Sequence, residues 1–383
     1  MGFEHYISVG SEQLRCGYTT GTCAAAAARG AAEALLSGVW PAAVQIDTPA
    51  GIPVEAELLE PSSGPGWAFC AVRKDGGDDP DATHGTLICV RVERMDHGVE
   101  VDGGQGVGRV TKPGLDQPVG AAAINRVPRG MIEQELREAL KAHGDTGGLK
   151  AVVSAPDGER IAQKTFNPRL GIVGGISILG TSGIVRPMSE AALIASVHLE
   201  LDMQKANGAR HVVITPGNYG EDFSRDVLGL GLTHWATCSN YIGEAIDHAA
   251  GLGFESLLLV GHIGKLVKVA AGNMNTHSRV SDGRRETLCA HTALAGGDRD
   301  TAAAVFASPT TDAAIEILKE AGLLEPVMEA VARELEVQLK HRAGEGMRIE
   351  ALFFSNRCGI LGKTSGADQL LSLHRPTGKD VSI

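Results

Sequence analysis

Residues 261–291, GHIGKLVKVAAGNMNTHSRVSDGRRETLCAH, concentrate side chains that can bind an anionic ligand. From 261 to 285 this segment has five basic residues and one acid in a chain of net charge −11. Such a patch attracts anions, and arginine suits carboxylates in particular. A basic face that only balances nearby glutamates is the alternative. We predict a ligand site here, with four substrate-binding candidates: Lys265, Lys268, Asn273 and Arg279.

His262 opens this segment directly after an apolar run that predicts a strand. Its ordinary pKa lies near neutrality, so it is our first candidate for a general base, with Asp222 as the second. A role confined to hydrogen bonding within the loop is equally compatible with the sequence. The spacing of His277, Cys289 and His291 matches no zinc pattern, and the acidic run 75–81 lacks the EF-hand order. No protein-bound metal is expected.

A second candidate site is the turn that follows the β-branched run 172–179. The pattern predicts a buried strand, a glycine loop and a helix over about 188–205, whose free N–H groups would suit a nucleotide-like cofactor. Many α/β proteins have such a turn without a ligand, and the G-x-G-x-x-G spacing of dinucleotide sites is missing. The cofactor-binding candidates are this turn and a residue after a later strand: Gly180, Thr181, Ser182, Gly183 and Asn218.

A Thr/Gly loop runs into five successive alanines at residues 24–28. Alanine has the highest helix propensity, and threonine hydroxyls can cap the first N–H groups of a helix. Close packing of this helix on a sheet explains the pattern as well as a ligand does. We include Thr19 and Thr20 among the substrate-binding candidates.

The order of predicted elements indicates an α/β protein of two domains. Residues 1–150 combine an alanine-rich helix with hairpin-linked strands, which is an α+β pattern. In residues 151–383 strands and helices alternate, which predicts a Rossmann-like, mostly parallel sheet flanked by helices. Ligands of such sheets bind beyond the carboxyl ends of the strands, so the polar loops there should share one crevice.

Composition excludes several classes of protein. The acidic balance and 4% aromatic content argue against a nucleic-acid binder. No apolar run is long enough to cross a bilayer, and the N-terminus lacks the pattern of a signal peptide, so a cytoplasmic location is expected. The seven scattered cysteines contain no C-x-x-C pair, so reduced thiols are expected.

Four segments together resemble the CbiD family, the cobalt-precorrin-5B C(1)-methyltransferases of cobalamin biosynthesis. They are LRCGYTTGTCAAAAA (14–28), KTFNPRLGIVGGISILGTSGIVRPMSEAAL (164–193), PGNYGEDF (216–223) and GHIGKLVKVAAGNMNTHSR (261–279). The resemblance implies transfer of a methyl group from S-adenosyl-L-methionine, as co-substrate, to C1 of cobalt-precorrin-5B to give cobalt-precorrin-6A. The substrate is a small-molecule corrinoid with many carboxylates, which agrees with the basic segment.

The placement of S-adenosylmethionine at 180–183 is an inference from the predicted strand and loop, not from the family. A nucleotide-dependent oxidoreductase using the same crevice, or a non-catalytic carrier of a corrin-ring intermediate, remain alternatives. A homo-oligomer, or transient contact with other enzymes of the pathway, stays open.

Overall fold

The computed structural model describes residues 3–376, which form two compact units that divide between Ser189 and Glu190. The domain boundary predicted at 150 lies inside the first unit. Position 150 falls within β12 (Gly148–Ser154), which pairs antiparallel with β8 (Leu87–Met95) and parallel with β9 (Gly98–Gly103). Because β12 is hydrogen-bonded on both sides, it belongs to the N-terminal sheet. Residues 155–189 belong to the same unit.

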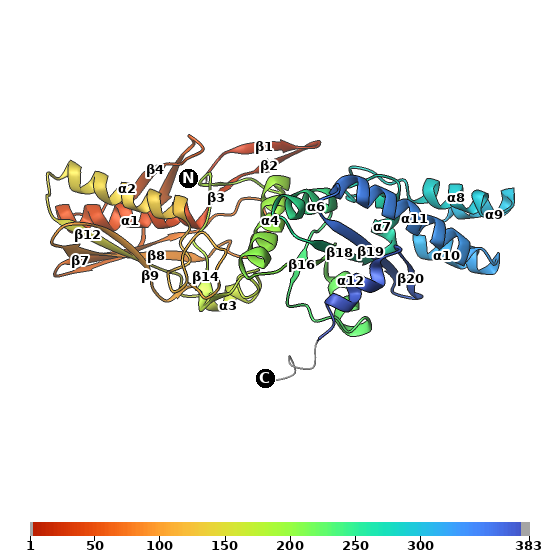
Figure 1. The fold of residues 1–383 in the computed structure, drawn as a ribbon. Helices are drawn as coiled ribbons and strands as arrows, with labels where there is room; N and C mark the ends of the chain where they lie inside the picture. The colour runs from red at the N-terminus through yellow and green to blue at the C-terminus, as the bar shows by residue number, and fades with distance from the viewer. Residues whose placement is uncertain (1–2, 377–383) are drawn as a thin grey trace. The chain divides into compact units, whose positions relative to one another are not determined.

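Unit 1 packs two helices on a five-stranded sheet of order β6-β7-β8-β12-β9, with β6 at Leu59–Gly64 and β7 at Trp67–Arg73. Helix α1 (Thr20–Ser37) lies beside α2 (Arg126–Ala142), as Figure 1 shows. The five successive alanines of α1, residues 24–28, have no exposed surface. Because alanine adds so little bulk, its backbone can approach the sheet closely, as the packing interpretation of the sequence expects.

The other strands of unit 1 are short pairs around this core. They are β1 (Tyr6–Val9) with β2 (Glu12–Arg15), β3 (Gly17–Tyr18) with β15 (Ile184–Val185), β4 (Ala43–Asp47) with β5 (Pro53–Glu57), β10 (Gly106–Val107) with β14 (Gly175–Ile176), and β11 (Arg109–Val110) with β13 (Ile172–Val173). A short helix, α3, spans Gly158–Ala162. The buried strand predicted over 172–179 is therefore wrong: only two two-residue strands form there, and neither joins a large sheet.

Unit 2 is built on a five-stranded sheet of order β17-β16-β18-β19-β20. The strands are β16 (His211–Thr215), β17 (Trp235–Thr237), β18 (Ser256–His262), β19 (Arg348–Ser355) and β20 (Gly359–Lys363). All neighbours pair in parallel except β19 and β20. The near-continuous apolar runs of β18 and β19 are buried, as central parallel strands require.

Helices surround this sheet, and several appear in the right half of Figure 1. Their bounds are α4 (Glu190–Ala206), α5 (Asn218–Asp222), a π-helical turn (Phe223–Val227), α6 (Ile242–Gly251), α7 (Ile263–Ala270), α8 (Arg284–Leu294), α9 (Arg299–Ala307), α10 (Thr311–Glu320), α11 (Leu324–Ala343) and α12 (Ala367–Leu373). Helix α4 confirms the helix predicted over about 188–205, although it belongs to unit 2 while the glycine loop before it belongs to unit 1.

Candidate active-site crevice

The carboxyl ends of three parallel strands of unit 2 open onto one crevice. Its volume is about 600 Å³, and its walls come from the segments after β16, β18 and β19, from the loop 276–278 and from the start of α10. The chain leaves β16 toward β17 on one side and later returns to β18 on the other. The position between β16 and β18, where the strand order reverses, is where open α/β sheets bind ligands.

Lys265 lies in the wall of the crevice, in the first turns of α7. Its ammonium donates to the carbonyl of Pro216 at 2.6 Å and to that of Ser239 at 3.2 Å, so it joins the segment after β16 to the segment after β17. Burial lowers its pKa. No ion pair joins this ammonium to a carboxylate within residues 3–376.

Lys268, one turn further along α7, is only 2% exposed. Its ammonium donates to the carbonyls of Thr276 at 3.1 Å and Ser281 at 2.9 Å. Burial again lowers the pKa of this lysine, partly opposed by the nearby Asp282 carboxylate. Both acceptors belong to one loop, so the lysine braces the loop that forms part of the crevice wall.

His262 ends β18 and caps α7. Its Nδ1 accepts a hydrogen bond from the backbone N–H of Gly264 at 3.1 Å. A backbone N–H can only donate, so the neutral ring carries its hydrogen on Nε2. Burial lowers the pKa of His262, an effect that the Asp312 carboxylate partly offsets. In this geometry the imidazole is a neutral hydrogen-bond donor at the crevice wall.

Asp312 is the carboxylate of the crevice and comes from the first turn of α10. The buried hydroxyl of Ser355, at the end of β19, donates to its Oδ1 at 2.8 Å. Sequence reasoning missed Asp312, because an acid after a capping threonine is an ordinary helix start. Only the fold brings α10 to the ends of β18 and β19.

The other predicted residues of unit 2 lie outside the walls of this crevice. Asp222 is exposed and its carboxylate accepts from the guanidinium of Arg225 at 2.8 Å. Asn218 begins the five-residue α5, whose next two residues line the crevice. Asn273 is half-buried after α7, and Arg279 is exposed next to the crevice residue Ser278. The structure thus brings together His262, Lys265 and Lys268 of the predicted set.

The loop 180–183 packs against the start of α1 in unit 1. Thr22 Oγ1 donates to the carbonyl of Gly183 at 2.7 Å, and Thr20 Oγ1 accepts from the N–H of Leu179 at 3.0 Å. Gly180 has a φ of +132°, and a Cβ placed there would lie 2.4 Å from the Thr19 side chain. These glycines are needed because the loop approaches the threonines so closely.

The predicted arrangement of a buried strand, this loop and a helix directly after it is therefore not formed, although helix α4 itself is present. The loop runs into β15 and not directly into a helix. Thr19 and Thr20 are 5% and 2% exposed, with their hydroxyls engaged in the cap of α1 and in the contact with this loop. Binding of a cofactor by the loop 180–183, and of the substrate by Thr19 and Thr20, stays a prediction. The strand–loop–helix arrangement that suggested a cofactor site at this loop is not present.

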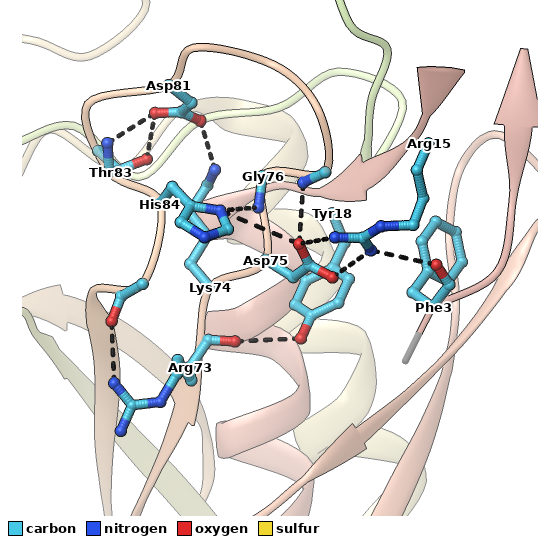
Figure 2. Close-up of polar contacts among 12 residues, drawn as sticks. Phe3, Arg15, Tyr18, Arg73, Lys74, Asp75, Gly76, Asp81, Thr83 and His84 are labelled. Carbon is cyan, nitrogen blue, oxygen red and sulfur yellow. Dashed lines mark hydrogen bonds and ion pairs between the residues drawn. The ribbon is translucent and has the colours of Figure 1, made fainter. Parts of the chain in front are cut away.

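The acidic segment 75–81 is held by the protein itself, as Figure 2 shows. The Asp75 carboxylate accepts from Arg15 at 2.5 and 2.9 Å, and this guanidinium holds the pKa of Asp75 below its usual range. Asp81 pairs with Lys74, which is 3% exposed. Within residues 3–376 no group of three or more His, Cys, Asp or Glu side chains is arranged to hold a metal ion. The ion pairs Arg15–Asp75 and Lys74–Asp81 therefore hold the loop 75–81 in place.

These features define an α/β protein with a polar, lysine-bearing crevice at the carboxyl ends of a mostly parallel sheet. Family models match two parts of the chain: "CbiD" over residues 7–187 and "CbiD, C-terminal domain" over residues 275–365. The chain belongs to the CbiD family. No helix in the described part of the chain has both the length and the apolar character needed to cross a membrane.

Relatives of the same family match nearly the whole chain. A protein of Ruminiclostridium cellulolyticum is 46% identical over 353 residues, 92% of each chain, and one of Thermoanaerobacter sp. is 46% identical over 362 residues, 94% of this chain and 98% of the relative. Both are named cobalt-precorrin-5B C(1)-methyltransferase. A crystal structure of the cobalamin biosynthesis protein CbiD from Archaeoglobus fulgidus matches at 30% identity and a TM-score of 0.40, covering 73% of this chain and 87% of that one.

Proposed function

We propose that this protein is an S-adenosylmethionine-dependent methyltransferase that methylates C1 of cobalt-precorrin-5B in cobalamin biosynthesis. The observation that carries the proposal is the 46% identity to a relative of that name over 92% of both chains. With so little of either chain unmatched, the two proteins share both units. The name of the relatives implies S-adenosylmethionine as the methyl donor.

The donor supplies a methyl group activated by the positive sulfonium. As the electron pair of C1 forms the new C–CH₃ bond, the S–CH₃ bond breaks and its electron pair stays on sulfur, giving S-adenosylhomocysteine. The ring takes over the positive charge that the sulfonium loses. Because the leaving group is already activated, the protein's main task is to align the two reactants.

We further propose that unit 2 is a Rossmann-like domain that binds a ligand at the ends of β16 and β18, and that unit 1 is an α+β domain. The free state of all seven cysteines supports a reducing compartment, and we propose the cytoplasm.

For the macrocycle we propose contacts with Asn273 and the exposed Arg279, which belong to the loop that leads to the crevice. Arginine can bind a carboxylate with two parallel hydrogen bonds, and the corrinoid bears many carboxylates. We propose that His262 donates a hydrogen bond from Nε2 to a bound ligand. Asp222 is not included, because it is ion-paired outside the crevice.

The test is a single-turnover reaction of the purified protein with enzymatically prepared cobalt-precorrin-5B and methyl-labelled S-adenosylmethionine. We expect one label per macrocycle and an equal amount of S-adenosylhomocysteine. Binding of the corrinoid without release of S-adenosylhomocysteine would indicate a carrier. Oxidation or reduction of the ring with a nicotinamide cofactor, without methyl transfer, would indicate an oxidoreductase.

A further inference from the structure

We infer that the crevice of unit 2 is the methyl-donor site, and that Lys265 binds the carboxylate of the donor's methionine end. This inference rests on the proposed function, and it names a site and an atom that the function alone leaves open. It differs from the sequence-based placement of the donor at 180–183 in unit 1. The inference rests on the hydrogen bonds of Lys265, on the position of the crevice and on the polar groups in its walls.

Lys265 has the capacity for one more partner. An ammonium has three N–H donors, and two of them account for the bonds to Pro216 and Ser239. These acceptors are neutral carbonyls, so the positive charge is solvated by dipoles but not neutralised within residues 3–376. A cation kept in a cavity wall without a carboxylate partner is suited to an anionic ligand.

The position of the crevice favours a nucleoside over a macrocycle. It lies between β16 and β18, where the strand order reverses, and such positions bind nucleotides in doubly wound sheets. Its volume of about 600 Å³ is within the range of sites for cofactors and small ligands. S-adenosylmethionine combines a nucleoside with one carboxylate, whereas the macrocycle carries many carboxylates on a much larger frame.

Asp312 gives the crevice a complementary charge. Ser355 donates to Oδ1 of this carboxylate, which keeps further acceptor capacity for the ammonium or the ribose hydroxyls of the donor. A cation and an anion in the same cavity suit a ligand whose amino-acid end is a zwitterion. In a site that bound only carboxylates, the Asp312 carboxylate would repel the ligand.

Lys268 has a different task from Lys265 despite their similar sequence context. It is 2% exposed and both of its acceptors belong to the loop 276–281. Lys265 is only partly buried and joins segments that follow two different strands. Arg284 also lines the crevice, but its guanidinium donates to the Asp282 carboxylate at 2.6 and 2.8 Å. Among the described lining residues, the positive charge left for a ligand is therefore that of Lys265.

The first test needs no variant. Calorimetric titration of the full-length protein compares S-adenosylhomocysteine with its decarboxylated analogue, which lacks only the carboxylate. A charged hydrogen bond to the carboxylate predicts that the analogue binds about 10-fold to 100-fold more weakly. Equal affinities would overturn the inference, whatever the effect of any mutation.

The second test uses Lys265→Met, which keeps the apolar stem and removes the charge. The variant should lose about the same factor in affinity for S-adenosylhomocysteine and bind the decarboxylated analogue as the wild type does. Lys340→Met is the matched control, since Lys340 lies on the exposed side of α11 and pairs with Glu336. The control should bind both ligands as the wild type does.

The outcomes separate this inference from the proposed function. If Lys265→Met binds S-adenosylhomocysteine normally but loses affinity for cobalt-precorrin-5B, the lysine serves the macrocycle and the inference fails while the enzyme remains a methyltransferase. Unchanged affinity for both ligands would make Lys265 a brace of the loops and also overturn it. A wild-type protein that neither binds S-adenosylhomocysteine nor transfers methyl would instead contradict the proposed function.

Discussion

His262 shows how one hydrogen bond limits the chemistry of a residue. The lone pair on Nδ1 is occupied by the N–H of Gly264, and the remaining nitrogen carries hydrogen in the neutral ring. The lowered pKa keeps this neutral form dominant at pH 7. The general base expected from the sequence would therefore have to give up the cap of α7 before it could accept a proton.

We predict that His262→Asn transfers methyl at a rate within a few-fold of the wild type, because asparagine is also a good helix cap and its amide NH₂ keeps a hydrogen-bond donor. His262→Ala should lose about 0.5–2 kcal/mol of unfolding free energy with the cap. Single-turnover rates at saturating substrate and several pH values, together with denaturant unfolding, measure both effects. A loss of about 10²–10⁴ in rate in both variants, together with a changed pH dependence of the rate, would contradict this prediction and support His262 as the base.

His374 makes the stability of unit 2 depend on pH. Its side chain is buried after α12, and its Nε2 has no hydrogen-bond partner among residues 3–376. Burial, reinforced by His211 and His234, lowers its pKa to about 4. Between pH 6.5 and 4 the unfolded chain binds a proton that the native state does not, so this contribution to stability is lost as the pH falls.

We predict that the wild type loses about 3 kcal/mol of unfolding free energy through this residue between pH 6.5 and pH 4. His374→Leu should flatten the dependence over that range, because leucine cannot titrate. Denaturant unfolding at a series of pH values measures the slope, and His341→Gln, at an exposed position of α11, is the control. Parallel pH curves for wild type and His374→Leu would contradict the prediction.

At the scale of elements, glycines let segments of unit 1 approach one another. Gly106 has a φ of +71°, and a Cβ there would lie 1.8 Å from the carbonyl oxygen of Ala155. A Cβ on Gly158 or Gly175 would lie 2.0 Å from the carbonyl oxygen of Gly106. The glycine-rich passage 103–108 is thus explained by backbone packing around β10 and α3.

Close contacts also limit the side chains that the loop 180–183 can accept. A valine at Gly183 would meet the Thr48 side chain at 2.7 Å in addition to adopting a φ of +78°. At Gly174 the φ is +86°, but apart from its two chain neighbours no atom of residues 3–376 lies within 4 Å of a Cβ. Both substitutions carry the backbone cost of about 1–2 kcal/mol, and only Gly183→Val adds overpacking of about 1–3 kcal/mol.

Thermal unfolding should therefore show a larger loss of stability for Gly183→Val than for Gly174→Val. Affinity for S-adenosylhomocysteine should be normal in Gly183→Val below its melting temperature, if the donor binds in unit 2. Equal melting temperatures of the two variants would show that the contact with Thr48 is not tight. Weaker binding by a fully folded Gly183→Val would support the loop as the donor site.

At the scale of the whole molecule, each unit has its own hydrophobic core. One cluster joins α1, α2 and the sheet of unit 1, and a separate one joins β16, β18, β19 and the helices of unit 2. A unit with a closed core should fold alone. The fragment 190–383 is then expected to unfold cooperatively and to bind S-adenosylhomocysteine with the affinity of the full chain.

Circular dichroism during heating and calorimetric titration of this fragment measure the two properties. A fragment that folds cooperatively without binding would place part of the donor site in unit 1. A fragment that lacks a cooperative transition would show that unit 2 needs unit 1 to fold.

Elements with local sequence signals can be predicted without the structure. The alanine run 24–28 predicts α1 through helix propensity, and the apolar runs at β16, β18 and β19 predict buried parallel strands through their length and pattern. Because parallel strands end at one edge, the sequence also predicted a crevice there, with His262 and Lys265 beside it. The quoted motifs identified the family.

Which polar groups share that crevice, and which are engaged elsewhere, depends on how distant segments pack in the folded chain. Residues 172–179 look like a buried strand, but their partners are short segments far away in the sequence, which no local pattern encodes. Lys265 and Lys268 are alike in sequence, and their tasks differ because their ammonium groups reach different backbone carbonyls. Asp312 enters the site because helix packing brings α10 to the ends of β18 and β19. Such contacts join positions distant in the chain, so their energies depend on the folded arrangement and not on neighbouring residues.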